Sequence, residues 1–148
     1  MDAIGLAASV VTLIGVVVTN SQKLYDLSQK LGSTPNHLER LLHSVKKFER
    51  LAMDVRKRSK ALNERESSES LLLLWADQHE RIQKDLQNLA NEVYEIHGLA
   101  ESSIKPGNEK LVRARLKLWL AGSTIREYEK RMEGHANFFG LLLEMMIE

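Results

Sequence analysis

The histidines are the residues of this chain best suited to metal binding or acid–base chemistry. The sequence has five of them, at His37, His43, His79, His97 and His135. A zinc site on a helix needs two histidines four residues apart, as in the His-Glu-x-x-His pattern, and no pair here has that spacing. His79 and His135 fall among regularly spaced apolar residues, where a single histidine is usually a boundary residue bonded to one neighbour. We therefore expect no metal site.

Other patterns that carry catalysis are also missing from the sequence. There is no cysteine, and Gly5 and Gly15 are isolated rather than part of a phosphate-binding loop. Acidic residues near the end of the chain alternate with basic ones at helical spacing, which predicts a solvated face with ion pairs. These residues are Glu127, Glu129 and Glu133, with Arg126, Lys130 and Arg131. We expect no enzyme activity, no cofactor and no small-molecule substrate.

The strongest chemical feature is the uncharged start of the chain. No residue from Ala3 to Gln22 is ionisable, and Ala3–Val18 is an apolar run of 16 residues broken only by one serine and one threonine. A transmembrane helix needs about 20 apolar residues, so this run is too short to span a bilayer alone. A signal peptide would begin with basic residues, whereas Asp2 is the only early charge. We interpret the run as part of the fold.

Apolar residues repeat at steps of three and four along most of the chain, which is typical of amphipathic helices. The spacing predicts one helix from the start of the chain to Gly32, a second from Pro35 to Asn63 and a third from Leu72 to Ala100. Gly32 suits a helix C-terminus and Pro35 suits a first helical turn. The predicted buried stripe of the first helix is Leu6, Val10, Leu13, Val17, Asn20, Leu24, Leu27 and Leu31.

The end of the chain predicts one further helix with a break in it. Ser102–Asn108 is the clearest interruption, and a helical pattern then starts near Leu111 and is interrupted again at Ala121–Ser123. We expect an all-α fold, an up-and-down antiparallel four-helix bundle whose last helix is kinked or split near Gly122. A length of 148 residues predicts a single domain over residues 1–148. Because the helical pattern still runs at Met145–Glu148, we expect this domain to be the N-terminal part of a longer protein.

The first predicted helix has more apolar surface than one seam of a bundle requires. Residues beside the stripe are apolar and the remaining face is small and neutral, so no side of its first 16 apolar residues carries a charge. One interpretation is a central helix buried on several sides. The other is a segment that is sheltered in the folded protein and can be released into lipid, where a helix satisfies its own backbone. The residues directed into the membrane would be Ile4, Gly5, Leu6, Val10, Val11, Leu13, Ile14, Val16, Val17 and Val18.

Basic residues gather in the second predicted helix, although the net charge of the chain is only +1. A basic residue near an anionic leaflet contributes about 1 kcal/mol, which makes this cluster a candidate for contact with anionic lipid. The cluster is Lys46, Lys47, Arg50, Arg56, Lys57, Arg58 and Lys60, against the acidic Glu49 and Asp54. A merely solvated helix face is the alternative. The aromatic residue within the cluster, Phe48, belongs to the predicted apolar stripe of this helix and not to a face for base stacking, so we expect no nucleic-acid binding.

Three segments together resemble a known family. They are the opening Met1–Leu13, the later Arg115–Trp119 and the closing Leu141–Leu143. These segments resemble the N-terminal domain that precedes fungal STAND (NLR-like) proteins, the HeLo-like group of cell-death effector domains. The resemblance implies a helical bundle related in kind to those of the mixed-lineage kinase domain-like protein and of plant resistance proteins. In such bundles the N-terminal helix permeabilises membranes after oligomerisation, and by position that role would belong to Ile4–Val18.

The resemblance and the uncharged helix together predict a membrane-targeting, pore-forming cell-death effector domain that acts on oligomerisation. The implied partners are anionic membrane lipids, further copies of the chain, and a nucleotide-binding sensor that is either C-terminal or a separate protein. Such a domain is expected in the cytoplasm at rest and at the plasma membrane when activated, and the lack of cysteine gives no sign of an oxidising compartment. The alternative is a non-lytic helical module for self-association or adaptor binding in a signalling protein.

Overall fold

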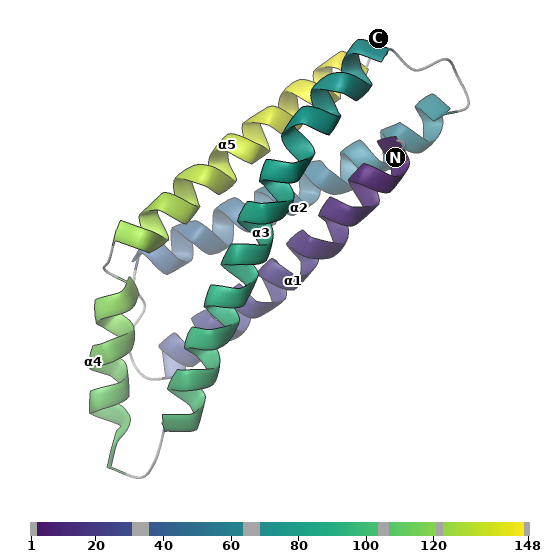
Figure 1. The fold of residues 1–148 in the computed structure, drawn as a ribbon. Coiled ribbons are helices and arrows are strands. Elements are labelled where there is room, and N and C mark those ends of the chain that lie inside the picture. Colours follow the sequence, from purple (N-terminus) through teal and green to yellow (C-terminus); the bar gives the residue numbers. More distant parts are fainter. Residues whose placement is uncertain (1–2, 31–35, 64–68, 104–106, 121–122, 147–148) are drawn as a thin grey trace.

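A computed structural model describes residues 3–30, 36–63, 69–103, 107–120 and 123–146. Within these ranges the chain forms five helices and no strand, which confirms the prediction of an all-α protein (Figure 1). The helices are α1 (Ala3–Lys30), α2 (Asn36–Asn63), α3 (Glu69–Ser103), α4 (Glu109–Leu120) and α5 (Ser123–Met146). The break expected near Gly122 falls between the end of α4 and the start of α5, and residues 121–122 themselves lie outside the described ranges.

The start of α4 follows from local chemistry. Gly107 has a φ of 90°, a left-handed conformation that glycine adopts without a steric penalty. The next residue, Asn108, accepts a hydrogen bond through its backbone oxygen from the backbone N–H of Val112 at 3.2 Å. This bond closes the first helical turn. The interruption predicted at Ser102–Asn108 falls between α3, which ends at Ser103, and α4, which begins at Glu109, and residues 104–106 lie outside the described ranges.

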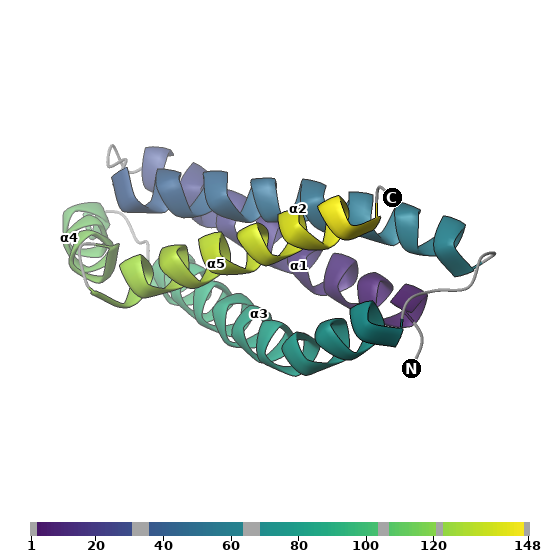
Figure 2. The ribbon, with the colours of Figure 1, turned by 90° about the horizontal axis from the view of Figure 1, so that it is seen from above.

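The neighbours of each helix differ from those of the simplest up-and-down bundle. In such a bundle each helix packs on the next one along the chain. Here α1 packs on both α2 and α3, α2 packs on α5, and α4 has a few contacts with α3 and with α5. Figures 1 and 2 show α1 and α3 running in one direction and α2 and α5 in the other. The helix that follows α2 in the chain is therefore not its main partner.

The core draws apolar side chains from all five helices and is centred on an aromatic pair. Phe48 of α2 and Phe139 of α5 meet edge to face, with ring centroids 4.9 Å apart and planes at 85°. This is a preferred geometry for two aromatic rings. Ile82, Leu86 and further residues of α3 complete the core from the other side. This pair is part of the extensive packing between α2 and α5.

The buried line of α1 is shifted from the stripe that apolarity predicts. Val10, Val17 and Leu24 are fully buried as expected. The other buried residues of this line are Ile14, Ser21 and Ser28, each one position after the predicted Leu13, Asn20 and Leu27. The reason is that α1 lies between two helices, so its most enclosed line runs midway between its two contact faces. Leu13 and Leu27 are partly buried and pack against the core from one side.

Replacing Phe139 with alanine is expected to lower the free energy of unfolding by about 3–5 kcal/mol, because it removes a buried ring and leaves a cavity. Leu141, two residues further along α5, is 57% exposed, and Leu141→Ala should change stability by less than about 0.5 kcal/mol. Urea unfolding of both variants measures the difference. Equal losses in the two variants would contradict this packing of α5.

Candidate functional site

The predicted membrane-directed residues lie mostly inside the resting bundle. Val10, Ile14 and Val17 are fully buried. A second group, Val11, Leu13 and Val18, is partly buried against the core, and Val16 is 46% exposed. The remaining three, Ile4, Gly5 and Leu6, belong to α1, but their side chains lie outside the described part of the structure. In this state α1 is a core helix held between α2 and α3.

In its first half, the outward face of α1 is neutral, and its threonine hydroxyls bond to the backbone of the same helix. Thr12, Val16 and Thr19 are exposed on this face. The Thr12 hydroxyl donates to the backbone oxygen of Ala8 at 3.0 Å, and the Thr19 hydroxyl donates to that of Gly15 at 2.9 Å. Such bonds within one helix satisfy a hydroxyl without a partner outside the helix. In the first half of α1, from Thr12 to Thr19, the exposed strip therefore has neither charges nor unbonded hydroxyl hydrogens, whereas charged residues such as Lys23 and Asp26 are exposed further along the helix.

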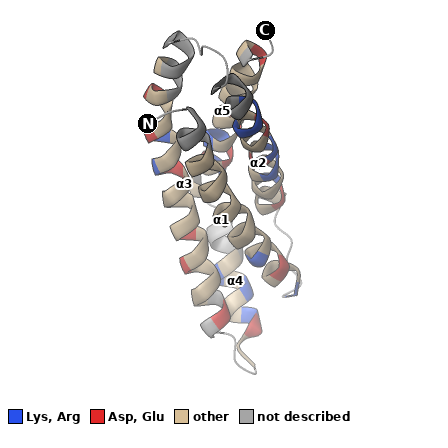
Figure 3. Ribbon diagram, turned by 90° about the vertical axis from the view of Figure 1, so that its right-hand side faces the viewer, with Lys and Arg blue, Asp and Glu red and all other residues tan. Residues whose placement is uncertain are grey.

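The basic residues predicted to contact lipid are exposed to solvent on α2. All of those whose side chains are described are exposed: Lys46, Lys47, Arg50, Arg56, Lys57 and Arg58. Figure 3 shows Lys and Arg gathered along α2. Lys60 belongs to α2, but its side chain lies outside the described part. Of the two acidic residues in this stretch, Asp54 is exposed and Glu49 is half-buried towards α1.

One hydrogen bond and one close approach show the register between α1 and α2. The Tyr25 hydroxyl donates to the carboxylate of Glu39 at 3.4 Å. The Glu49 side chain lies near Gly15, since a methyl group added to this glycine would be 4.0 Å from a carboxylate oxygen of Glu49. Both pairs belong to one antiparallel register, which places the start of α1 level with the C-terminal part of α2. The structure thus brings the two predicted features together: the uncharged half of α1 lies beside the basic part of α2.

A polar cluster that sequence reasoning did not single out joins α3 to α5. The ring nitrogen Nε2 of His135 lies 2.7 Å from Asp85 Oδ2, and both side chains are nearly buried. Arg131 reaches the other carboxylate oxygen of Asp85 at 3.4 Å and the carboxylate of Glu127 at 2.6 Å. The expectation that His135 is a boundary residue bonded to a neighbour is confirmed. Asp85 was missed, although an aspartate between Ile82 and Leu86 in an apolar stripe was a visible signal.

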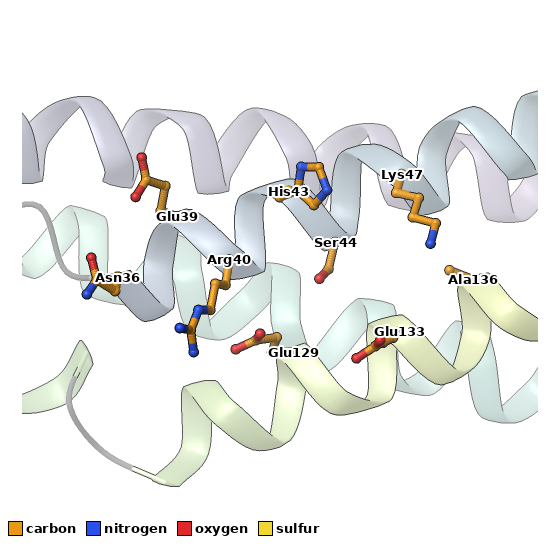
Figure 4. A pocket seen from close by; sticks show the side chains of 9 residues that line it. All are labelled: Asn36, Glu39, Arg40, His43, Ser44, Lys47, Glu129, Glu133 and Ala136. Atoms are coloured by element: carbon orange, nitrogen blue, oxygen red, sulfur yellow. The ribbon is translucent and has the colours of Figure 1, made fainter.

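Two open grooves run along α5. The larger, about 910 Å³, lies between α3 and α5, and its lining includes Asp85, Arg131 and His135. The smaller, about 590 Å³, lies between α2 and α5 (Figure 4). Arg40 and Lys47 of α2 line it opposite Glu129 and Glu133 of α5. Among the described residues, no three His, Asp or Glu side chains are grouped closely enough to share a metal ion.

Tyr128 extends the polar contact between α5 and α3. Burial and a hydrogen bond to Glu92 raise the pKa of Tyr128 to about 12, with a smaller contribution from the charge of Asp85, while Arg131 acts in the opposite direction. The phenol is therefore held in its neutral form by the fold. Together with the Asp85 cluster, this bond adds polar interactions to the contact between α3 and α5.

In the described ranges, the fold and these surfaces define an all-helical protein whose first helix has an uncharged first half, largely buried between α2 and α3, and whose second helix carries an exposed basic cluster. A scan against protein-family models, a search of curated proteins and a search of solved structures find no match for the chain. The resemblance to the HeLo-like group therefore stays a prediction. In the portion of the chain that the structure describes, none of the helices has the length and hydropathy needed to cross a membrane.

The pKa of Tyr128 predicts a loss of stability at alkaline pH. An unfolded tyrosine loses its proton near pH 10, whereas Tyr128 in the folded protein keeps it to about pH 12. Its contribution to the free energy of unfolding is therefore complete below pH 10 and is lost as the pH rises to about 12. Urea unfolding over this range should show a smaller decline for Tyr128→Phe than for the wild type. The exposed Tyr94 is the control, and Tyr94→Phe should decline as the wild type does; a full decline in Tyr128→Phe would contradict the assignment.

Proposed function

We propose that this chain is a helical-bundle effector domain that permeabilises anionic membranes when several copies are brought together, with α1 as its membrane-directed helix. The observation that carries the proposal is the pairing of a helix segment free of charge with an exposed basic face on the adjoining α2. In this proposal α1, α2, α3 and the combined α4 and α5 are the four members of an up-and-down four-helix bundle. The protein would rest in the cytoplasm and act at the plasma membrane.

The length of the apolar run explains why oligomerisation is needed. Sixteen helical residues, Ala3–Val18, span about 24 Å, against about 30 Å of hydrocarbon in a bilayer. A single helix of this length would lie at the interface or thin the bilayer locally. Several copies inserted together share that penalty. Sensor proteins that oligomerise, either C-terminal to this domain or separate from it, are therefore the partners that we propose.

Releasing α1 from the bundle requires compensation for lost burial. Each fully buried side chain such as Val10, Ile14 or Val17 contributes about 1.5–3 kcal/mol relative to exposure in water. Burying the same side chains in lipid hydrocarbon is also favourable, and a helix satisfies its own backbone hydrogen bonds there. The neutral outward face, with Thr12 and Thr19 bonded to their own helix, adds no charge to be transferred.

A second candidate function is a non-lytic module for self-association or adaptor binding. The complete burial of Val10, Ile14 and Val17 favours it, because a helix needed for the core cannot leave without unfolding the domain. The two functions differ in what a charge on the exposed side of α1 does. A module that never enters lipid tolerates such a charge, whereas a membrane-directed helix does not.

Val16→Glu is the variant that separates them. Val16 is 46% exposed, so the substitution leaves the fold intact, but it places a charge inside the apolar run. Such a charge is unfavourable by about 2.5–3.5 kcal/mol at the centre of a membrane helix and by less toward the end of the run, where Val16 lies. The full chain, carrying a ligand-induced oligomerisation tag at its C-terminus, is added to dye-filled phosphatidylserine vesicles. Leakage from Val16→Glu should be at least about tenfold slower than from the wild type, and the neutral Val16→Leu should match the wild type. Leakage from none of the oligomerised proteins, or the same leakage from all, would refute the membrane function.

Charge reversal on α2 tests the contact with anionic lipid. The double variant Arg50→Glu with Lys57→Glu should weaken binding to phosphatidylserine vesicles by at least about tenfold, since each basic residue contributes about 1 kcal/mol at an anionic surface. The matched control is Lys110→Glu with Arg113→Glu on α4, which makes the same change in net charge at exposed positions. Vesicle co-sedimentation measures both. If the two double variants lose the same affinity, net charge rather than the α2 face governs binding.

A further inference from the structure

Among the four long helices α1, α2, α3 and α5, the α3–α5 seam is a sparse contact compared with the α1–α2, α1–α3 and α2–α5 contacts. The α1–α2, α1–α3 and α2–α5 pairs meet along extended contacts, whereas α3 and α5 approach each other at few points. An open groove of about 910 Å³ lies between them. A side chain added at Gly134, on the α5 side of this groove, would meet no other atom within 4 Å. The helices thus form an open series, α3–α1–α2–α5, whose two end members are only loosely joined.

Polar side chains provide the tie across this seam. Asp85 of α3 contacts His135 of α5 at 2.7 Å and Arg131 of α5 at 3.4 Å. Hydrogen bonds to charged groups are the stronger ones in proteins, and removing one partner of a nearly buried pair leaves the other without compensation. Glu92 and Tyr128 add a further bond in the same antiparallel register.

We propose that Asp85, His135 and Arg131 form a latch that closes the bundle, and that the bundle opens at the α3–α5 seam with the α1–α2 contact as its hinge. Behind the latch lie apolar side chains of α3, among them Ile82, Leu86 and Leu89, which are fully buried. Opening at the groove exposes these residues without separating α1 from α2. The latch concerns the resting fold, so it does not depend on membrane activity. If the proposed function also holds, opening precedes the release of α1.

The absence of cysteine from the sequence allows the opening to be measured directly. Two introduced cysteines carry spin labels, and pulsed electron resonance gives the distribution of distances between them. Asn88→Cys with Gly134→Cys spans the groove between α3 and α5. Thr12→Cys with Met53→Cys spans the proposed hinge, and both of those residues are exposed. The measurements use the full chain in solution, without lipid.

Asp85→Asn keeps the shape of the side chain and removes its charge. In this variant the population at longer distance should rise about tenfold for the groove pair, as expected for losing a charged hydrogen bond, while the hinge pair stays as in the wild type. Glu127→Gln is the control, because it alters only the partner of Arg131 on the same helix; it should leave both distributions unchanged. Arg131→Gln, which retains the bond between Asp85 and His135, should shift the groove pair in the same direction by less.

Two results would overturn the latch. One is an unchanged groove distance in Asp85→Asn, and the other is equal widening of the groove and hinge pairs, which means general loosening. If circular dichroism shows that Asp85→Asn does not fold, Arg131→Gln is judged by the same two criteria. Vesicle leakage is measured separately on the same proteins. If a variant opens at the groove but causes no leakage after induced oligomerisation, the latch proposal is supported and the membrane function is contradicted.

Discussion

The arrangement of this bundle depends on covering α1. The first half of this helix has no charged face to turn to water, and most of its apolar surface is covered from two sides by α2 and α3. This requirement places α1 between those helices and leaves α5 to pack on α2 through the Phe48–Phe139 pair. The α3–α5 contact is sparse because α3 packs mainly on α1 and α5 packs mainly on α2.

The helices themselves could be predicted from the sequence with good accuracy. The apolar spacing predicted a first helix to Gly32, and the described helix ends at Lys30; the break near Gly122 separates Leu120 from Ser123. These features are local, since they depend on periodicity within one segment and on residues such as Gly107 that favour a particular backbone conformation. Which helices become neighbours could not be predicted, because several arrangements satisfy the same apolar stripes.

The candidate surfaces divide in the same way. Exposed basic residues such as Arg50 could be predicted because charge clusters on a helix rarely become buried. The exact buried line of α1 could not, because Ile14 and Ser21 are enclosed only when two partners are present. The pairing of Asp85 with His135 joins positions 50 residues apart, and nothing in either local pattern specifies the other. A polar residue inside an apolar stripe signals that a partner exists, and the fold alone identifies it.

The hydrogen bond between Tyr25 and Glu39 lies close to the C-terminal end of α1. The neighbouring Gln29 donates to the Tyr25 hydroxyl at 3.0 Å and reinforces it. Toward its beginning, α1 is held instead by contacts of Val10, Ile14 and Val17 with the core, which have no preferred direction. The described part of α1 thus combines a polar bond to α2 near its C-terminal end with apolar packing along the half that has no charge. If α1 is released as proposed, the segment around Val10–Val17 can separate from the core without breaking the Tyr25–Glu39 bond.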